Sequence, residues 1–247
     1  MSKILIYDIE TSPNLGMFWR PGNKVSIGHD NIVEERKVIT IAYKWHGKKR
    51  VYGLTWDSEK DDKAMLEEFA KVLEEADAAI AHNGDAFDIK WLRGRCLKHG
   101  IPFSPFTKTV DTYKISRGLF NLNSHKLDYL HNFLGGKGKI STGGFSLWKN
   151  IMLHNKPKDL KKMLDYNKND VVILEEVFEM LKPYMKPFMH ASLLEGGEAW
   201  HCPHCGSDEL HHYRARTTAT GSIRWQRQCE GCGAYSTISN QIYNKLP

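Results

Sequence analysis

Short apolar runs alternate with longer amphipathic stretches along most of the chain. Predicted strands, rich in Ile, Val, Ala and Tyr, cover residues 3–9, 38–45, 50–54, 78–82 and 109–112. Apolar positions recur at helical spacing over residues 60–75, 89–99, 124–134 and 157–181. The second and third strands are close enough in sequence to form a hairpin. Strands, a hairpin and crossover helices in this order predict an α/β fold with a mixed sheet.

Two stretches lack such a pattern, and a third marks a domain boundary. Residues 12–36 form a polar excursion with two prolines and three glycines, and their role does not follow from the pattern. Residues 135–144, with five glycines and two lysines, predict a loop that either borders a substrate path or simply connects two helices. Prolines after residue 182 end the first domain, so we expect domains at 1–190 and 199–247.

Four of the five cysteines form two Cys-x2-Cys pairs, each followed by glycine. Four thiolates at this spacing suit a tetrahedral zinc ion, and each glycine lets its turn aim backbone N–H groups at the sulfurs. The alternative is a disulfide or free thiols, and a cytoplasmic location disfavours disulfides. The sequence therefore predicts one structural Zn²⁺ with the ligands Cys202, Cys205, Cys229 and Cys232.

The segment between the two cysteine pairs predicts two β segments around a Gly-Ser turn, which resembles a zinc ribbon. It has little core of its own, so zinc must supply much of its folding free energy. Arginines interleaved with aromatic residues suit nucleic-acid contact by phosphate pairing and stacking, and a docking surface for a protein partner is the alternative. The predicted substrate contacts are Arg214, Arg216, Arg224, Trp225 and Arg227.

The first apolar run carries two carboxylates two residues apart. If it is a strand, its period of two places Asp8 and Glu10 on the same face. Neighbouring acids repel each other and lose hydration on burial, and a divalent cation would compensate for both effects. The alternative is a strand end that simply faces solvent. The metal interpretation predicts further acids elsewhere in the chain.

Such acids occur at two places downstream. Asp88 lies where the strand at 78–82 gives way to a helix, after a turn that begins at Asn83. Asp170 lies in the long predicted helix, and Tyr166, four residues earlier, shares its helix face. Four acids and one tyrosine thus form a candidate catalytic set.

The order Asp-x-Glu, Asn-x3-Phe-Asp and Tyr-x3-Asp resembles the three motifs of the DEDD 3′–5′ exonucleases, in the subclass whose third motif carries tyrosine (DEDDy). That family includes the proofreading domains of DNA polymerases. The resemblance covers roughly residues 1–185 and implies an RNase H-like mixed sheet flanked by helices. The long excursion at 12–36 and the zinc ribbon depart from the proofreading pattern.

The resemblance implies a two-metal mechanism with two Mg²⁺ or Mn²⁺ ions. Asp8, Glu10 and Asp170 would hold the first ion. Asp8 would also bridge to the second ion, whose hydration shell Asp88 would order. Tyr166 would orient the attacking water, because an unperturbed phenol titrates near 10 and is a poor base at neutral pH.

The expected activity is hydrolysis at the 3′ ends of DNA, preferably single-stranded, with Thr11 presenting its backbone to the terminal 3′ hydroxyl. The motif form and the lack of a polymerase region suggest a free-standing nuclease of DNA repair or replication. A 3′–5′ exoribonuclease is one alternative, because the chemistry at phosphorus is insensitive to the 2′ hydroxyl. A non-catalytic zinc-ribbon adaptor for nucleic acid or protein is the other.

Composition and charge agree with a soluble nucleic-acid enzyme. Of the 247 residues, 41% are hydrophobic and 26% charged. Apolar runs fall short of the roughly 20 residues that span a bilayer, and a signal peptide is not evident, so we expect a cytoplasmic protein without a membrane partner. The net charge is +6, and basic residues cluster at 44–50, 93–98, 137–139 and 156–162, which suits a polyanionic substrate, although a solvated surface would look similar.

Overall fold

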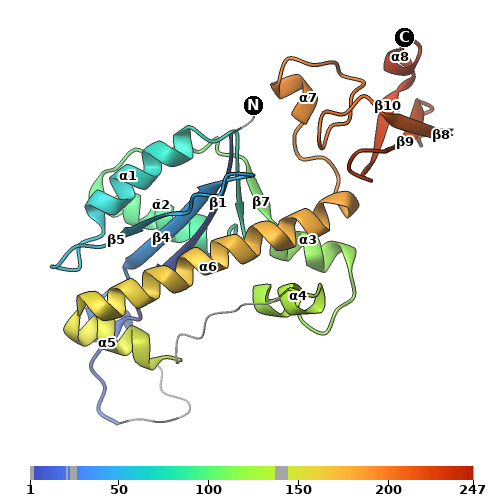
Figure 1. Cartoon of the computed structure of the whole chain (residues 1–247). Helices are drawn as coiled ribbons and strands as arrows, with labels where there is room; N and C mark the ends of the chain where they lie inside the picture. The colour runs from blue at the N-terminus through green and yellow to red at the C-terminus, as the bar shows by residue number, and fades with distance from the viewer. Residues whose placement is uncertain (1–2, 21, 23–26, 137–143, 247) are drawn as a thin grey trace. The chain divides into compact units, whose positions relative to one another are not determined.

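The computed structural model describes residues 3–20, 22, 27–136 and 144–246, which form two compact units (Figure 1). One contains residues 4–111 and 135–175, and we call it the sheet unit. The other contains residues 1–3, 112–134 and 176–247, and we call it the ribbon unit. The domain limits expected from the sequence stay a prediction, because compactness does not test independent folding.

Five strands form the central sheet of the sheet unit, in the order β5-β4-β1-β6-β7. They are β1 (Ile4–Thr11), β4 (Val38–Trp45), β5 (Tyr52–Thr55), β6 (Ala78–Ala81) and β7 (Thr109–Asp111). β1 pairs antiparallel with β4 and parallel with β6, so the predicted mixed sheet is confirmed. The central strand β1 carries Asp8 opposite Ala42 and Glu10 opposite Thr40.

Helices cover both faces of this sheet (Figure 1). They are α1 (Lys63–Glu74), α2 (Asp88–His99), α5 (Ser146–His154) and α6 (Pro157–Leu181), of which residues 157–175 belong to this unit. Odd-numbered side chains of β1 pack towards α1, and the ring of Tyr7 lies 5.4 Å from that of Phe69. Even-numbered side chains face α6, as does Lys44 on β4, which pairs with Glu175. The two acids of β1 therefore face the helix that carries the third motif.

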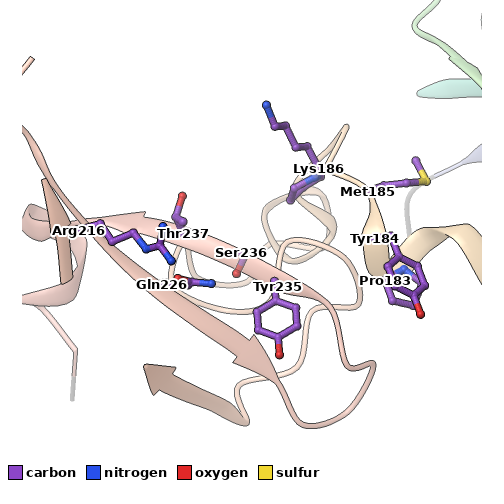
Figure 2. Close-up of a pocket in the computed structure, with 10 residues that line it drawn as sticks. Pro183, Tyr184, Met185, Lys186, Arg216, Gln226, Tyr235, Ser236 and Thr237 are labelled. Atoms are coloured by element: carbon purple, nitrogen blue, oxygen red, sulfur yellow. The ribbon is translucent and has the colours of Figure 1, made fainter. Parts of the chain in front are cut away.

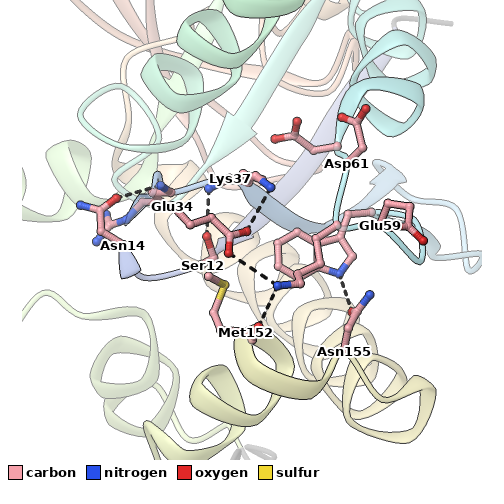
Figure 3. Close-up of polar contacts among 12 residues, drawn as sticks. Ser12, Asn14, Glu34, Lys37, Glu59, Asp61, Met152 and Asn155 are labelled. Carbon is pink, nitrogen blue, oxygen red and sulfur yellow. Dashed lines mark hydrogen bonds and ion pairs between the residues drawn. The ribbon is translucent and has the colours of Figure 1, made fainter. Parts of the chain in front are cut away.

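The chain between β1 and β4 is more regular than predicted. Two short strands, β2 (Leu15–Gly16) and β3 (Ile32–Glu34), pair with each other and flank η1 (His29–Asn31). The ends of the excursion are fastened, because the N–H of Ser12 donates to the carbonyl of Lys37 and the N–H of Lys37 donates to Ser12 Oγ, both at 2.9 Å (Figure 3). Residues 21 and 23–26 lie outside the described residues.

Helix α5 was not predicted from the sequence. Its polar contacts fix it beside the turn after β5: Lys60 Nζ donates to the carbonyl of Met152 at 2.9 Å, and Trp56 Nε1 donates to Asn155 Oδ1 at 3.0 Å (Figure 3). The glycine-rich loop before it falls mostly at 137–143, outside the described residues. Its expected place beside a substrate path stays a prediction.

The ribbon unit combines short helices with a three-stranded sheet in the order β10-β9-β8. The strands are β8 (Leu210–Thr217), β9 (Ile223–Cys229) and β10 (Tyr235–Ser239). The short helices are α3 (Thr112–Leu119), α4 (Leu127–Phe133), η2 (Lys182–Tyr184), α7 (Ala191–Leu194) and α8 (Asn240–Tyr243). The β8–β9 hairpin was predicted, whereas β10 was not. Within the described part of the chain, every helix is too short or too polar to cross a membrane.

Candidate functional site

Three carboxylates from two elements meet on the α6 face of the sheet. Asp8 and Glu10 come from β1 and Asp170 from α6, and one carboxylate oxygen of each lies within 4.8 Å of the others. A β-bulge follows Glu10, so Thr11 ends the strand at the edge of this group. Residues far apart in the sequence thus form one acidic cluster, which we call the acidic triad.

The position of Asp8 is fixed by a buried hydrogen-bond chain. Asn167 Nδ2 donates to Asp8 Oδ2 at 2.5 Å, and Thr40 Oγ1 donates to Asn167 Oδ1 at 3.1 Å. Both Asn167 and Thr40 are completely buried. Because a buried amide is costly to leave unpaired, this chain holds the carboxylate in one orientation. Sequence reasoning missed both residues.

Glu10 has its own support from α5. A hydrogen bond from the side chain of Trp148 reaches its carboxylate, and indole Nε1 is the only donor that tryptophan offers. This contact depends on a helix that the sequence pattern did not predict. The residue could not have been assigned to the site without it.

Burial and mutual repulsion raise the pKa values of these acids. Burial is the largest cause for Asp8, whose pKa is well above its ordinary value, and the charges of Asp88, Glu10 and Asp170 add to it. Burial followed by the charges of Asp170 and Asp88 raises the pKa of Glu10 to about 8. The protein therefore concentrates negative charge here at an electrostatic cost, which a bound cation would offset.

Asp88 lies beside the triad but outside the group whose oxygens converge. It is the first residue of α2, is 2% exposed, and its Oδ1 accepts a hydrogen bond from the N–H of Ile9 at 3.2 Å. Burial raises its pKa to about 7, although the bond from Ile9 acts in the opposite direction. Its charge raises the pKa of both Asp8 and Glu10, so the four acids form one electrostatic system.

The turn before Asp88 is shaped by its own residues and by Asp111. Asn83 adopts the left-handed region at φ 62°, and a Cβ on Gly84 would lie 2.4 Å from that of Ala81. The carboxylate of Asp111, at the end of β7, accepts from the N–H groups of Asn83 at 2.9 Å and Asp85 at 3.2 Å. Asp111 therefore fixes the turn that positions Asp88.

Tyr166 lies one helical turn before Asp170 and hydrogen-bonds to its carboxylate. Burial raises the pKa of the phenol well above 10, and the charge of Asp170 and this hydrogen bond raise it further. The phenol is therefore protonated throughout the neutral and mildly alkaline range. Its hydroxyl donates a hydrogen bond at the triad, and in the metal-free protein the phenol is a poor base.

The donor chemistry of the triad suits Mg²⁺ or Mn²⁺. Both ions prefer hard oxygen ligands, and the triad offers carboxylates alone. Asp8, Glu10 and Asp170 would be the ligands, and the charge of Asp88 acts on Asp8 from beside them. Soft metals would gain nothing from this set, because it contains neither sulfur nor imidazole.

The raised carboxylate pKa values predict a pH-dependent stability in protein free of Mg²⁺ and Mn²⁺. The Glu10 carboxylate binds its proton more tightly in the folded protein than in the unfolded one. Protonated Glu10 therefore adds to the free energy of unfolding below pH 4, and this contribution is lost as the pH rises towards 8. Glu10→Gln should therefore raise the Tm at pH 8.5 by a few degrees, since about 1 kcal/mol corresponds to roughly 2–4 °C in a chain of this size. Thermal unfolding followed by circular dichroism measures this.

At pH 4 the same substitution should leave the Tm nearly unchanged. Asp165→Asn is the matched control, because it removes an exposed carboxylate from α6. An equal effect of Glu10→Gln at both pH values would contradict the electrostatic account.

Four cysteine sulfurs in the ribbon unit converge on one point, within 4.8 Å of one another. Cys202 and Cys232 Sγ are 3.7 Å apart, and Cys205 and Cys229 Sγ are 3.6 Å apart. A tetrahedron with Zn–S bonds of about 2.3 Å has edges of about 3.8 Å, so the four thiols fit Zn²⁺. The four-cysteine cluster fits a zinc-ribbon module, as the cysteine spacing indicated.

Glycines shape both cysteine turns as expected. Gly206 and Gly233 follow the second cysteine of each pair and have φ of +82° and +72°. Backbone N–H groups of Ser207 and Ala234 then reach the sulfurs of Cys205 and Cys232. Such bonds stabilise thiolate ligands.

The ribbon separates the predicted substrate contacts into two groups. Arg214, Arg216 and Arg224 are exposed on β8 and β9. Arg227, by contrast, is 1% exposed and donates to Ser236 Oγ at 3.0 Å and to the carbonyls of Trp200 and His201. Its donors hold the ribbon together, so the prediction that it contacts substrate does not fit the structure.

Trp225 is likewise committed inside the ribbon unit. Its ring stacks on that of Tyr243, with the ring centroids 3.6 Å apart and the ring planes at 9°. Its Nε1 donates to Asn240 Oδ1 at 2.9 Å. Both partners belong to α8, which Trp225 therefore fastens to the sheet. A stacking role on a nucleic-acid base does not fit this arrangement.

Comparisons with known proteins agree with this fold. The RNase H superfamily model matches residues 31–182, which include Asp88, Tyr166 and Asp170 and begin after Asp8 and Glu10. A DNA polymerase from Thermococcus hydrothermalis is 30% identical over 112 residues, covering 41% of this chain and 6% of the polymerase. A DNA polymerase from Thermococcus litoralis is 23% identical over 223 residues, covering 80% of this chain and 12% of the polymerase.

A solved structure shows a similar fold. The family B DNA polymerase from the hyperthermophilic archaeon Pyrobaculum calidifontis superimposes with a TM-score of 0.57 at 19% identity. The superposition covers 74% of this chain and 25% of that polymerase. The chain thus spans a quarter or less of each of these three polymerases.

Proposed function

The chain belongs to the RNase H superfamily, and from this we propose that it is a metal-dependent 3′–5′ exonuclease acting on single-stranded DNA. The observation that carries the proposal is the acidic triad, whose three carboxylates converge within 4.8 Å at the centre of the fold. Similarity to two DNA polymerases supports nucleic acid as the substrate. The three motifs supply the direction of digestion.

The four acids have two kinds of role in the proposal. Asp8, Glu10 and Asp170 would hold the first divalent ion, Asp8 would also contribute to holding a second, and Asp88 would order the surrounding water. The bound ions supply Lewis acidity, lowering the pKa of water and neutralising charge on the phosphate. Thr11, at the bulge after Glu10, presents its backbone to the terminal sugar.

Tyr166 orients the attacking water in this proposal without taking its proton. We expect Tyr166→Phe to lower the single-turnover rate about ten- to hundredfold, less than the roughly 10²–10⁴-fold that a general base contributes. Because the pKa of the phenol lies above 10, the alkaline side of the pH–rate profile should keep its shape up to pH 9. A kinetic pKa below 9 in the parent that Tyr166→Phe abolishes would assign proton transfer to the phenol instead.

Digestion of end-labelled oligonucleotides tests the activity and its direction. With Mg²⁺ or Mn²⁺, a 5′-labelled single-stranded DNA should give a ladder, while a 3′-labelled copy should release its label at once as a mononucleotide. Asp8→Ala should give neither product. Immediate release of the label from the 5′-labelled strand would show that digestion runs from 5′ to 3′ instead.

RNA of the same sequence distinguishes the second candidate function. The four acids and Tyr166 would act identically on either nucleic acid, so an exoribonuclease would digest RNA faster than DNA with the same dependence on Asp8. If the folded, zinc-loaded protein cleaves neither DNA nor RNA in Mg²⁺ or in Mn²⁺, the proposed function is instead that of a zinc-ribbon adaptor.

A further inference from the structure

The two faces of the ribbon sheet differ in burial where β9 pairs with β10. Directly opposite residues of an antiparallel sheet share a face, and successive residues alternate. Arg227 of β9 lies opposite Ser236 of β10, and both are buried. Gln226, the next residue, lies opposite Thr237 on β10 and Arg214 on β8 and therefore belongs to the exposed side. Extending the register defines what we call the ribbon face: His211, Arg214, Arg216, Arg224, Gln226, Gln228, Tyr235, Thr237 and Ser239.

The charge of the ribbon face is entirely positive. Its three arginines are exposed, and none of the residues of β8, β9 and β10, all of which are described, is acidic. Two glutamines, a threonine, a serine and a histidine supply other polar groups. A cationic surface without acidic side chains attracts a polyanion. It would be a poor electrostatic match for an average protein surface, which carries charges of both signs.

Two tyrosines stand on this face. A register shift between residues 212 and 214 turns Tyr213 towards it, where the Tyr213 hydroxyl donates to Gln228 Oε1 at 2.7 Å. The ring of Tyr213 is stacked on that of Tyr235, with centroids 5.9 Å apart and planes at 29°. Tyr213 remains 50% exposed and Tyr235 48% exposed. Half-exposed rings beside arginines are the platform on which unpaired bases stack.

The ribbon face opens on one side into a pocket of about 690 Å³. Its far wall is the segment Pro183–Pro187, and Figure 2 shows this segment and the strand residues bordering the same hollow. Lys186 on that wall is exposed, and Tyr184 is 65% exposed. Two lining residues of the pocket, Arg216 and Lys186, are basic, and no lining residue is acidic. The wall is therefore positively charged, like the ribbon face.

We propose that the ribbon face and the Pro183–Pro187 wall bind single-stranded nucleic acid. The phosphates pair with the exposed cations, and bases stack on the Tyr213–Tyr235 pair and on Tyr184. Because the ribbon strands carry no acidic side chain, the face favours nucleic acid over a protein as its ligand. Because its exposed rings can stack on bases, it favours single strands, whose bases are unpaired, over a duplex. The site lies in the ribbon unit, whereas the acidic triad lies in the sheet unit, and it extends the proposed function by adding a second surface that binds nucleic acid. It concerns binding alone and would hold even if the triad hydrolysed nothing.

Fluorescence anisotropy with a labelled dT oligonucleotide tests this on the full, zinc-loaded chain carrying Asp8→Ala, which keeps the strand intact. We expect Tyr235→Ala to weaken binding about tenfold, as loss of one stacking ring typically does. Tyr235→Phe keeps the ring and should bind within about twofold of the parent. Phe106→Ala, which removes a ring that is 90% exposed in the sheet unit, should have no effect.

Salt dependence tests the phosphate contacts separately. Each contact with a single strand contributes about 0.7 to the slope of log K against log salt concentration, so Arg214→Gln with Arg216→Gln should lower the slope by about 1.4. Exposed Lys71→Gln on α1 is the charge control and should leave the slope unchanged. Zinc content and the Tm confirm that each variant is folded.

Unchanged affinity in Tyr235→Ala, or an unchanged slope in the double arginine variant, would overturn the proposal. An unchanged affinity for the oligonucleotide would favour a protein partner as the ligand of the ribbon face. The failure of the proposed hydrolysis is a different observation, namely intact oligonucleotide with the unsubstituted protein. The two outcomes are therefore distinguishable.

Discussion

Asp170→Ala should lower the rate of phosphodiester hydrolysis by at least about 10³-fold while the fold survives. In the proposed mechanism, removing one of three converging carboxylates would take a ligand from the divalent ion, and even a single lost hydrogen-bond donor costs an active site roughly 10²–10³-fold. Single-turnover rates with saturating Mn²⁺ measure the loss. Asp8→Ala should behave alike, because both residues belong to the acidic triad.

Asp165→Ala is the matched control for this substitution. It removes an exposed carboxylate from the same helix and should leave the rate within about twofold. Circular dichroism separates lost activity from lost structure. Hydrolysis by Asp170→Ala at the parent rate would remove this residue from the metal site.

Cys229→Ser should unfold the ribbon sheet and abolish stoichiometric zinc binding. Cys229 is 1% exposed, and the ribbon strands bury few apolar side chains of their own. Structural zinc contributes about 10–16 kcal/mol of apparent binding free energy in small zinc modules, more than such a sheet gains from packing. Hydrogen exchange should show loss of protection over β8, β9 and β10, while the sheet unit keeps its protection.

The fifth cysteine provides the control. Cys96 lies in the core of the sheet unit at 1% exposure, so Cys96→Ala should lower the stability of that unit and retain the zinc. A Cys229→Ser variant whose ribbon strands remain protected would show that the module folds without the metal.

Local periodicity predicted the arrangement of the acids but not what supports them. The period of two in β1 aligned Asp8 with Glu10, and helical spacing aligned Tyr166 with Asp170. Asn167 did leave a signal, because it interrupts the buried apolar stripe of α6 that continues at Val171. A polar residue in such a stripe is held by a partner.

Trp148 could not be assigned from the sequence. It lies on a nine-residue helix that follows a glycine-rich loop, and its contact with Glu10 joins distant parts of the chain. Short helices have weak periodicity, and packing rather than propensity decides whether they form. No local pattern encodes such a contact.

In the ribbon, cysteine spacing predicted the four-cysteine cluster, but composition alone could not assign its arginines to faces. The unpredicted strand β10 places Ser236 opposite Arg227 and so defines the buried side. Counting residues by type grouped Arg227 with Arg224, although the strand register separates inward from outward side chains. The period of two already places these two arginines on opposite faces of β9, and pairing with β10 shows which face is buried.

Calorimetric titration of Mn²⁺ into the zinc-loaded protein tests the central claim most directly, because it asks whether the acidic triad holds a divalent ion. We expect the parent to bind Mn²⁺ and Asp8→Asn to bind it more than about a hundredfold more weakly. Even loss of a residue that only supports a metal ligand typically costs about 10–100-fold in affinity. Equal Mn²⁺ affinity in the parent and in Asp8→Asn would contradict the account.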